Sequence, residues 1–401
     1  MNGAPVDLWR IMSADLIART GYQVGKSPLM PLFAASLGAG ELLVGAIVSA
    51  STITGIVLKP IFGWLSDRSG RTIWLFIGLA FFSGVPFLYS FVDSATGLLV
   101  IRLFHGLATA IFGPVTLALV AEMTPITRAE RLGWFGMARS GSYLLAPLIG
   151  SWLLTRLDPS TIFTLIGLIS CAAFLPVCMM DSTNLVTKYK SVKLQSIRRI
   201  WKVWIGTVVF NRGIWLAGSM ELVVYFMTYS IKVFLPLYAL QVAGFNLIIV
   251  GLFFTVQELL HLVTRPMGGR LGDHIGYLRS VQIGYGILIV GLISLPYADS
   301  ETALLLVASL LGLGQGLIFP STVAFVADRV NPNYLGVGMG LLGAVRNAGK
   351  VVGPLTAGAL LTTMNYSQVF HLGAVVVLIA AFVLFLFHKN GMAESFVSTK
   401  M

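Results

Sequence analysis

Ionisable side chains occur inside long apolar runs, where a charge is costly unless it is paired or hydrated. In the run from residue 9 to 36, Asp15, Arg19, Tyr22 and Lys26 follow one another at helical spacing. At 100° per residue these four positions share one face of a helix. A carboxylate and two cations on one face could bind a charged group and take up a proton, so this face is a candidate site.

The run from 212 to 242 repeats this arrangement with Glu221, Tyr225 and Lys232. In both runs the acid and the lysine are eleven residues apart, which is about 16 Å along a helix. Both lysines lie near the middle of their runs, where snorkelling to water is hardest. Two central cations favour an anionic or carboxylate-bearing substrate. The predicted substrate-binding residues are Lys26, Lys232, Arg19, Tyr22, Arg102 and Tyr225.

The acids are the predicted carriers of a coupled proton. Asp15 has the alternative of being an interfacial acid paired with Arg19 at i+4. Arg19 is expected to hold Asp15 ionised, whereas Tyr225 stands at the equivalent place beside Glu221 and supplies no charge. Glu221 is therefore the better predicted proton carrier, and the predicted set is Glu221, Asp15 and Glu258.

Two other positions have competing interpretations. Glu258 and His261 are three residues apart and either form a proton relay or are simply hydrated beside a water-filled cavity. His105 is interpreted as a packed histidine next to Gly106 rather than a ligand.

The composition shows what kind of element must position these residues. Of 401 residues, 56% are apolar and 11% charged, whereas soluble proteins carry about 25% charged residues. This predicts an all-α membrane protein with twelve spans of about 20 residues each. The apolar runs are 9–36, 42–65, 73–92, 96–122, 133–156, 160–180, 212–242, 247–267, 280–298, 302–327, 335–364 and 367–388.

Lysine and arginine are distributed unevenly over the loops between these runs. With both ends in the cytoplasm, nineteen of the 27 lie at or next to inner loops and ends, and Arg156 alone faces outward. The net charge of +11 is thus explained by topology rather than by nucleic-acid binding. The basic stretch 183–211 is predicted to be a cytoplasmic linker that can lie on anionic lipid headgroups.

The two halves of the chain repeat each other at an offset of 206 residues. Asp15 becomes Glu221, and Lys26 becomes Lys232. After one further residue is gained, Arg139 becomes Arg346. Since six runs separate equivalent points, the halves share one orientation, related by an axis along the membrane normal. The predicted domains are 1–182 and 212–390, each a six-helix bundle, with the linker 183–211 and a cytoplasmic tail 391–401.

The loop from Gly63 to Arg71 resembles the inner-loop signature of the major facilitator superfamily, with a weaker copy from Gly269 to Gly276. The segment from Arg102 to Gly106 is similar to that family's second motif. The resemblance implies a cluster that latches the inner face closed. Its predicted members are Asp67, Arg68, Arg71, Glu122, Asp273 and Asp328. The competing interpretation is a solvated loop that obeys the positive-inside rule.

The resemblance further implies a secondary transporter that works by alternating access. A small-residue motif typical of the family's antiporters is clearer at Gly349-x-x-x-Gly353-Pro354 than at its first copy around Pro147, and helix packing alone would also explain it. The favoured function is proton-coupled efflux of a small organic solute by antiport. The alternatives are proton-linked or facilitative uptake of an organic anion, and a non-transporting sensor or scaffold.

No enzyme motif, metal-ligand spacing or signal peptide is found, and the two cysteines lie seven residues apart in one apolar run. The sequence therefore predicts no cofactor and no metal. The expected partners are a small-molecule substrate, protons and membrane lipids. The chain is expected to be a monomer in the plasma or inner membrane, with both termini cytoplasmic.

Overall fold

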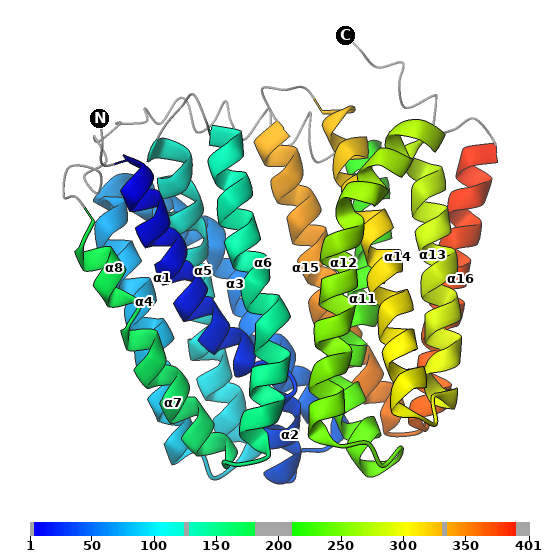
Figure 1. The fold of residues 1–401 in the computed structure, drawn as a ribbon, viewed down its shortest axis with the longest axis horizontal. Coiled ribbons are helices and arrows are strands. Elements are labelled where there is room, and N and C mark those ends of the chain that lie inside the picture. The colour runs from blue at the N-terminus through cyan, green and yellow to red at the C-terminus, as the bar shows by residue number, and fades with distance from the viewer. Residues whose placement is uncertain (1–3, 124–127, 181–210, 331–334, 390–401) are drawn as a thin grey trace. The chain divides into compact units, whose positions relative to one another are not determined.

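The computed structural model describes residues 4–123, 128–180, 211–330 and 335–389, and these residues form helices and short connections without any strand (Figure 1). The predicted linker 183–211, except for Asn211, and the tail 391–401 lie outside the described residues. In the first part of the chain the helices are α1 (Ala4–Val24), α2 (Leu29–Ser36), α3 (Glu41–Ser69), α4 (Arg71–Leu88), η1 (Tyr89–Phe91), α5 (Ala95–Met123), α6 (Arg128–Leu154), α7 (Pro159–Cys171) and α8 (Phe174–Cys178). In the second part they are α11 (Arg212–Gln241), α12 (Leu247–Ile275), α13 (Tyr277–Ser294), η3 (Leu295–Tyr297), α14 (Glu301–Ala327), α15 (Leu335–Leu361) and α16 (Tyr366–Lys389).

Every predicted apolar run is occupied by one of these helices or by a pair in sequence. Within the described residues, nine helical stretches are long and apolar enough to cross a membrane. The helices α1, α6 and α15 are not among them, and they carry buried or half-buried charges. A multi-pass helical membrane protein is thus confirmed, while the count of twelve spans remains a prediction.

The first apolar run is broken between α1 and α2. Residues 25–28 form a turn, and Pro28, which lacks a backbone N–H, is the residue that caps the start of α2. Lys26 lies in this break and its side chain is half-buried. The equivalent run in the second part is one unbroken helix, α11, which carries Lys232. Lys26 therefore lies between two helices, whereas Lys232 lies within one helix.

The chain divides into two compact units, residues 1–191 with 235–255 and residues 192–234 with 256–401. Residues 235–255 are thereby grouped with the first unit, although the sequence repeat places them in the second bundle. The division into bundles 1–182 and 212–390 remains a prediction.

Each unit has a buried interior and an apolar outer surface. In the first unit, α1, α4 and α5 pack around fully buried residues such as Ile11, Leu79 and Phe112. On α16 of the second unit, large apolar side chains such as Ile379 and Phe382 are exposed. Such exposure is stable when hydrocarbon rather than water covers it.

Candidate functional site

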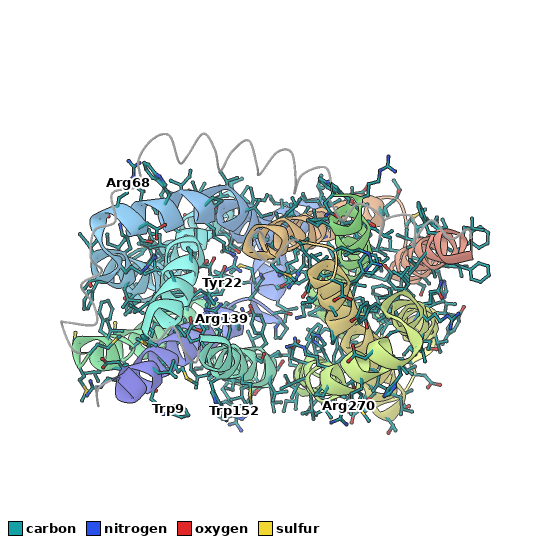
Figure 2. The ribbon with its side chains drawn as sticks, turned by 90° about the horizontal axis from the view of Figure 1, so that it is seen from above. Trp9, Tyr22, Arg68, Arg139, Trp152 and Arg270 are labelled. Atoms are coloured by element: carbon teal, nitrogen blue, oxygen red, sulfur yellow. The ribbon has the colours of Figure 1, made fainter. Side chains whose placement is uncertain are left out.

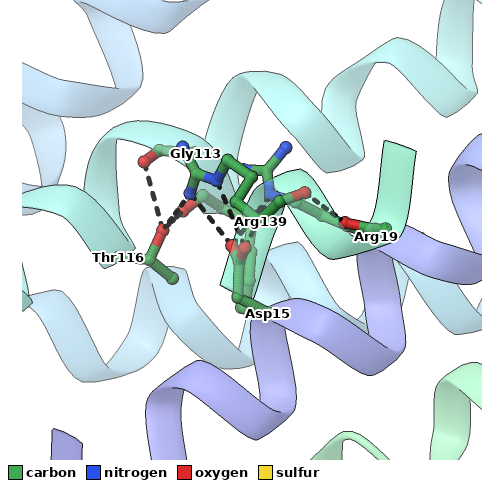
Figure 3. A network of polar contacts seen from close by, with 7 residues as sticks. Asp15, Arg19, Gly113, Thr116 and Arg139 are labelled. Atoms are coloured by element: carbon green, nitrogen blue, oxygen red, sulfur yellow. Dashed lines mark hydrogen bonds and ion pairs between the residues drawn. The ribbon is translucent and has the colours of Figure 1, made fainter. Parts of the chain in front are cut away.

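The first unit holds a buried acid bound by two arginines (Figure 3). The Arg19 guanidinium donates from Nε to Oδ1 and Oδ2 of Asp15 at 2.8 and 2.9 Å. Arg139 of α6 donates from Nη2 to Oδ1 at 3.0 Å and from Nε to Oδ2 at 3.2 Å. Arg139 Nη2 also lies 3.4 Å from the Thr116 hydroxyl, which accepts from it. Asp15 is only 1% exposed, so it is a buried acid with charge-assisted hydrogen bonds, and the expected pairing with Arg19 is one of them.

The second unit holds the corresponding arrangement. Glu221 is fully buried and accepts a hydrogen bond from Arg346 Nε at 2.7 Å. The Thr322 hydroxyl donates to its other oxygen at 2.6 Å. An acid on α11 is therefore bound by one group from α14 and one from α15.

The two clusters occupy positions that the sequence repeat makes equivalent: acid, threonine and arginine lie 206, 206 and 207 residues apart. Thr116 binds the arginine of its cluster, whereas Thr322 binds the acid. The sequence repeat matched Arg139 with Arg346, but neither arginine was included among the predicted site residues, and both threonines were missed. The signal that could have found them is the same offset, applied to Thr116.

The two clusters differ in which helix carries a tyrosine and which carries the second cation. In the first unit the second cation is Arg19 on α1, close to Tyr143 on α6. In the second unit the tyrosine is on α11, and Lys350 of α15 places its Nζ 4.7 Å from the centre of the Tyr225 ring. Tyr225 supplies no charge beside Glu221, but Arg346 contacts the acid directly and Lys350 lies nearby, two cations that the sequence analysis did not place there. One turn after the acid, α11 carries Tyr225 instead of a cation, and the cations near Glu221 come from α15.

Arg102 forms a separate feature of the first unit. Its side chain is fully buried, and within the described residues its nitrogens make no hydrogen bond of good geometry, although the Tyr89 hydroxyl lies close enough to interact with it. Its guanidinium carbon lies 5.2 Å from the centre of the buried Tyr22 ring. His105 is buried, and its Nδ1 forms a 3.0 Å hydrogen bond with the Tyr89 hydroxyl. This agrees with the interpretation of His105 as a packed histidine. A buried guanidinium without a hydrogen bond of good geometry favours an anionic guest.

The second unit carries a polar group on α12 in which Glu258 and His261 replace Thr52 and Gly55 of the first, while Arg265 corresponds to Lys59. Glu258 Oε1 lies 3.5 Å from His261 Nδ1, and Arg265 Nε donates to His261 Nε2 at 3.2 Å. Lys232 is half-buried on α11, with its Nζ 5.5 Å from the centre of the Tyr229 ring. The structure places Glu258 beside His261 as their spacing predicts, and it adds Arg265, which the sequence analysis did not include.

The predicted latch is built around the left-handed turn at Gly70, whose φ of 92° favours glycine. Arg71 crosses this turn and pairs with Asp67 at 2.6 Å between Nη2 and Oδ1. A second nitrogen of Arg71 donates to the Ser66 hydroxyl at 3.0 Å. Arg68 instead lies over the Trp64 ring and is exposed (Figure 2). The Glu122 side chain lies outside the described residues.

The second copy of the latch has the same turn, with Gly276 at a φ of 93°. Tyr277 replaces the arginine and interacts with both Asp273 and Asp328. A neutral phenol carries no charge to pair with these acids, which agrees with a weaker second copy.

The small-residue motif on α15 packs directly against α11. A Cβ at Gly349 or Gly353 would collide with the backbone carbonyls of Leu222 and Phe226. Helix packing is therefore sufficient to explain these glycines. Within the described ranges, no three His, Cys, Asp or Glu side chains come close enough together to hold a metal ion.

Comparison with known proteins gives consistent results over nearly the whole chain. The model of the Major Facilitator Superfamily matches residues 23–300 and 249–399. An uncharacterised MFS-type transporter of Methanocaldococcus jannaschii is 24% identical, covering 90% of this chain and 92% of its own. The multi-drug resistance efflux pump PmrA of Streptococcus pneumoniae is 27% identical over 86% of both chains. The multidrug resistance protein MdtG of Proteus mirabilis is 25% identical, over 87% of this chain and 88% of its own.

Solved structures agree on the fold. A bacterial homologue of the human lysosomal transporter Spinster, in an inward-facing and unoccupied conformation, aligns with a TM-score of 0.76 at 14% identity, covering 99% of this chain and 98% of that one. The human organic anion transporter MFSD10 aligns with a TM-score of 0.66 at 16% identity, over 96% of this chain and all of that one.

Proposed function

The chain belongs to the Major Facilitator Superfamily, and from this premise we propose that it exports a small organic solute from the cytoplasm in exchange for protons. It is a multi-pass membrane transporter and not an enzyme. Export, proton coupling, the plasma or inner membrane and cytoplasmic termini are the proposed parts. The names of PmrA and MdtG, both described as resistance proteins, support export.

The observation that carries the proposal is the buried acid in each unit, held by an arginine from another helix. Asp15 and Glu221 are 1% and 0% exposed, so each carboxylate depends on its cations to stay charged inside the protein. A proton that reaches such an acid weakens its hold on the arginine and so changes the contact between two helices. This links proton binding to helix arrangement, which alternating access requires. Asp15, Glu221 and Glu258 are the proposed acids, and Asp67 with Arg71 is the proposed inner latch.

The test uses purified protein in liposomes with an imposed pH gradient and ethidium as a cationic probe. We expect ethidium movement that follows the gradient and stops when an ionophore collapses it. Glu221→Gln is expected to lose gradient-driven movement, while Asp299→Asn, an exposed acid at a loop, is expected to behave as wild type. Ethidium movement by the wild type that does not depend on the pH gradient would contradict proton coupling. The absence of any ethidium flux would count against the export of cationic solutes.

A second candidate function, uptake of an organic anion, is favoured by the buried guanidinium of Arg102, which makes no hydrogen bond of good geometry within the described residues. Lys26, Lys232, Arg19, Tyr22 and Tyr225 are proposed to contribute to substrate binding in either direction of transport. The same liposomes loaded with carboxyfluorescein separate the candidates. Anion movement that Arg102→Gln weakens at least tenfold, with ethidium unmoved, would support uptake of anions over export of cations.

A further inference from the structure

The second unit contains an apolar cavity between α11, α15 and α16. Its walls come from residues 226–234 of α11, 356–361 of α15 and 366–376 of α16. Glu221 lies five residues before the first of these segments, which is about 7 Å along the helix. Among the described residues that line the cavity, no side chain is ionisable except the Tyr366 phenol. The cavity is therefore distinct from the charged cluster around Glu221.

The size and the walls of the cavity favour an apolar guest. Its volume is about 80 Å³, several times the roughly 10–15 Å³ that one water molecule needs. The Ser230 hydroxyl in the wall already donates to the Phe226 carbonyl oxygen at 2.8 Å, and water has few polar groups to bind there. Atoms that face an empty cavity lose contacts, so a cavity of this volume is disfavoured by roughly 25-fold relative to a filled one.

The cavity opens on the exposed side of α16. Leu372 lines it and is 37% exposed. Further along α16, Val375 and Ile379 are also exposed apolar side chains. In a membrane protein such a surface is covered by the hydrocarbon chains of lipids. The medium at the mouth of the cavity is therefore hydrocarbon, and a lipid chain is the guest that meets it first.

The depth of the cavity corresponds to one leaflet of the bilayer. From Tyr366 to Val376 the wall on α16 runs for ten residues, or about 15 Å, which is half of a hydrocarbon core of about 30 Å. At the same end of α16, the rings of Tyr297 and His371 lie 5.5 Å apart between their centres, and Tyr297 is 69% exposed. Exposed aromatic rings with a polar edge are typical of the headgroup level of a membrane.

The corresponding place in the first unit is closed by direct helix contact. The sequence repeat matches Met227 with Gly21 and Ala357 with Gly150. A Cβ at Gly21 would lie 3.0 Å from Oγ of Ser170 on α7, and a Cβ at Gly150 would lie 3.2 Å from a backbone oxygen of α1. Glycines thus let the helices of the first unit pack closely, whereas the second unit has side chains at both positions. The cavity is therefore a feature of the second unit and not a requirement of the duplicated fold.

We propose that this cavity binds the hydrocarbon chain of a membrane lipid whose headgroup lies beside Tyr297 and His371. The chain fills the space that α16 leaves against α11 and α15. With the proposed cytoplasmic termini, the lipid belongs to the outer leaflet. Lipid binding itself does not depend on proton coupling or on the direction of transport.

The test uses a photoactivatable lipid and the purified full-length protein in dodecyl maltoside micelles. The probe is phosphatidylethanolamine with a diazirine at the end of one acyl chain. On illumination the diazirine loses N₂, and the resulting carbene inserts into a nearby C–H bond. Modified peptides are then identified by mass spectrometry. We expect labelling that saturates at a single lipid per protein, falls on the three wall segments and is displaced by unlabelled phosphatidylethanolamine.

Two alanines on α15 provide a matched pair of variants. Ala357 lines the cavity and is 3% exposed, so Ala357→Leu places three further carbon atoms in the space for the lipid chain. We expect this variant to reduce labelling of the wall segments by about tenfold, within the roughly 25-fold preference for a filled cavity. Ala359 is exposed and does not line the cavity, and Ala359→Leu is expected to label as the wild type does.

Three results would overturn the proposal. The first is labelling of the wild type that does not saturate and is spread evenly along the exposed side of α16. The second is unchanged labelling of the wall segments in folded Ala357→Leu protein. The third is displacement of the lipid probe by ethidium, which would assign the cavity to a transported solute. If Ala357→Leu does not fold, the wild-type labelling pattern and the two competitors still decide the matter.

Discussion

Removal of Arg346 is predicted to destabilise the protein more than removal of its repeat partner Arg139. Glu221 is fully buried, and Arg346 is the cation in direct contact with it. Loss of one partner of a buried ion pair costs about 3–5 kcal/mol, because the remaining charge is left uncompensated. Since 30% of the Arg346 side chain is exposed, water screens part of the interaction and the lower end of this range is expected.

Arg139 differs because Asp15 keeps a second arginine. The bonds from Arg19 at 2.8 and 2.9 Å remain in Arg139→Gln. The loss is then nearer that of a charged hydrogen bond, about 1.5–3 kcal/mol. We expect Arg346→Gln to exceed Arg139→Gln by about 1 kcal/mol in the free energy of unfolding.

The assay is reversible unfolding in mixed micelles, followed by helical circular dichroism at neutral pH. The double variant Glu221→Gln with Arg346→Gln provides the control, because it removes the orphaned charge together with its partner. We expect the double variant to be more stable than Arg346→Gln alone, which is the signature of a coupled pair. A loss in Arg139→Gln equal to or greater than that in Arg346→Gln would refute the reasoning.

Three further predictions concern topology, the latch and a helix cap. Single cysteines at Ala39 and Ser300 should react with an impermeant thiol reagent in intact cells, and protection of both would contradict the proposed orientation. Asp67→Asn should keep substrate binding but shift the equilibrium between inward-open and outward-open states by about ten- to a hundredfold, because the ion pair of 2.6 Å with Arg71 is lost. Distance distributions between spin labels measure this shift. Hydrogen bonds from Thr161 hold the pKa of Asp158, the N-cap residue of α7, below its usual value. The ionised cap therefore stabilises the folded protein fully above the unfolded pKa of about 3.9, and this stabilisation is lost as the pH falls through the lowered pKa. Asp158→Ala should reduce the free energy of unfolding by about 1 kcal/mol at neutral pH and by less in acid, measured by thermal unfolding.

The sequence by itself determined the class, the helices and the repeat. In hydrocarbon each segment must satisfy its own backbone hydrogen bonds, so an apolar run of sufficient length can only be a helix. Each of the twelve runs accordingly contains helix in the structure. The paired face of α1 was also predictable, because Asp15 and Arg19 are one turn apart and helix geometry alone brings them together.

The tertiary structure decided which groups complete each site. Arg139 and Arg346 lie 124 and 125 residues from the acids they bind. Such contacts depend on how each helix is rotated about its axis and where it crosses its neighbour, which an apolar pattern with small residues on several faces does not specify. The second cation comes from α1 as Arg19 in the first cluster but from α15 as Lys350 in the second. The sequence of one helix therefore does not show the charge balance of its cluster, because either helix can supply the cation.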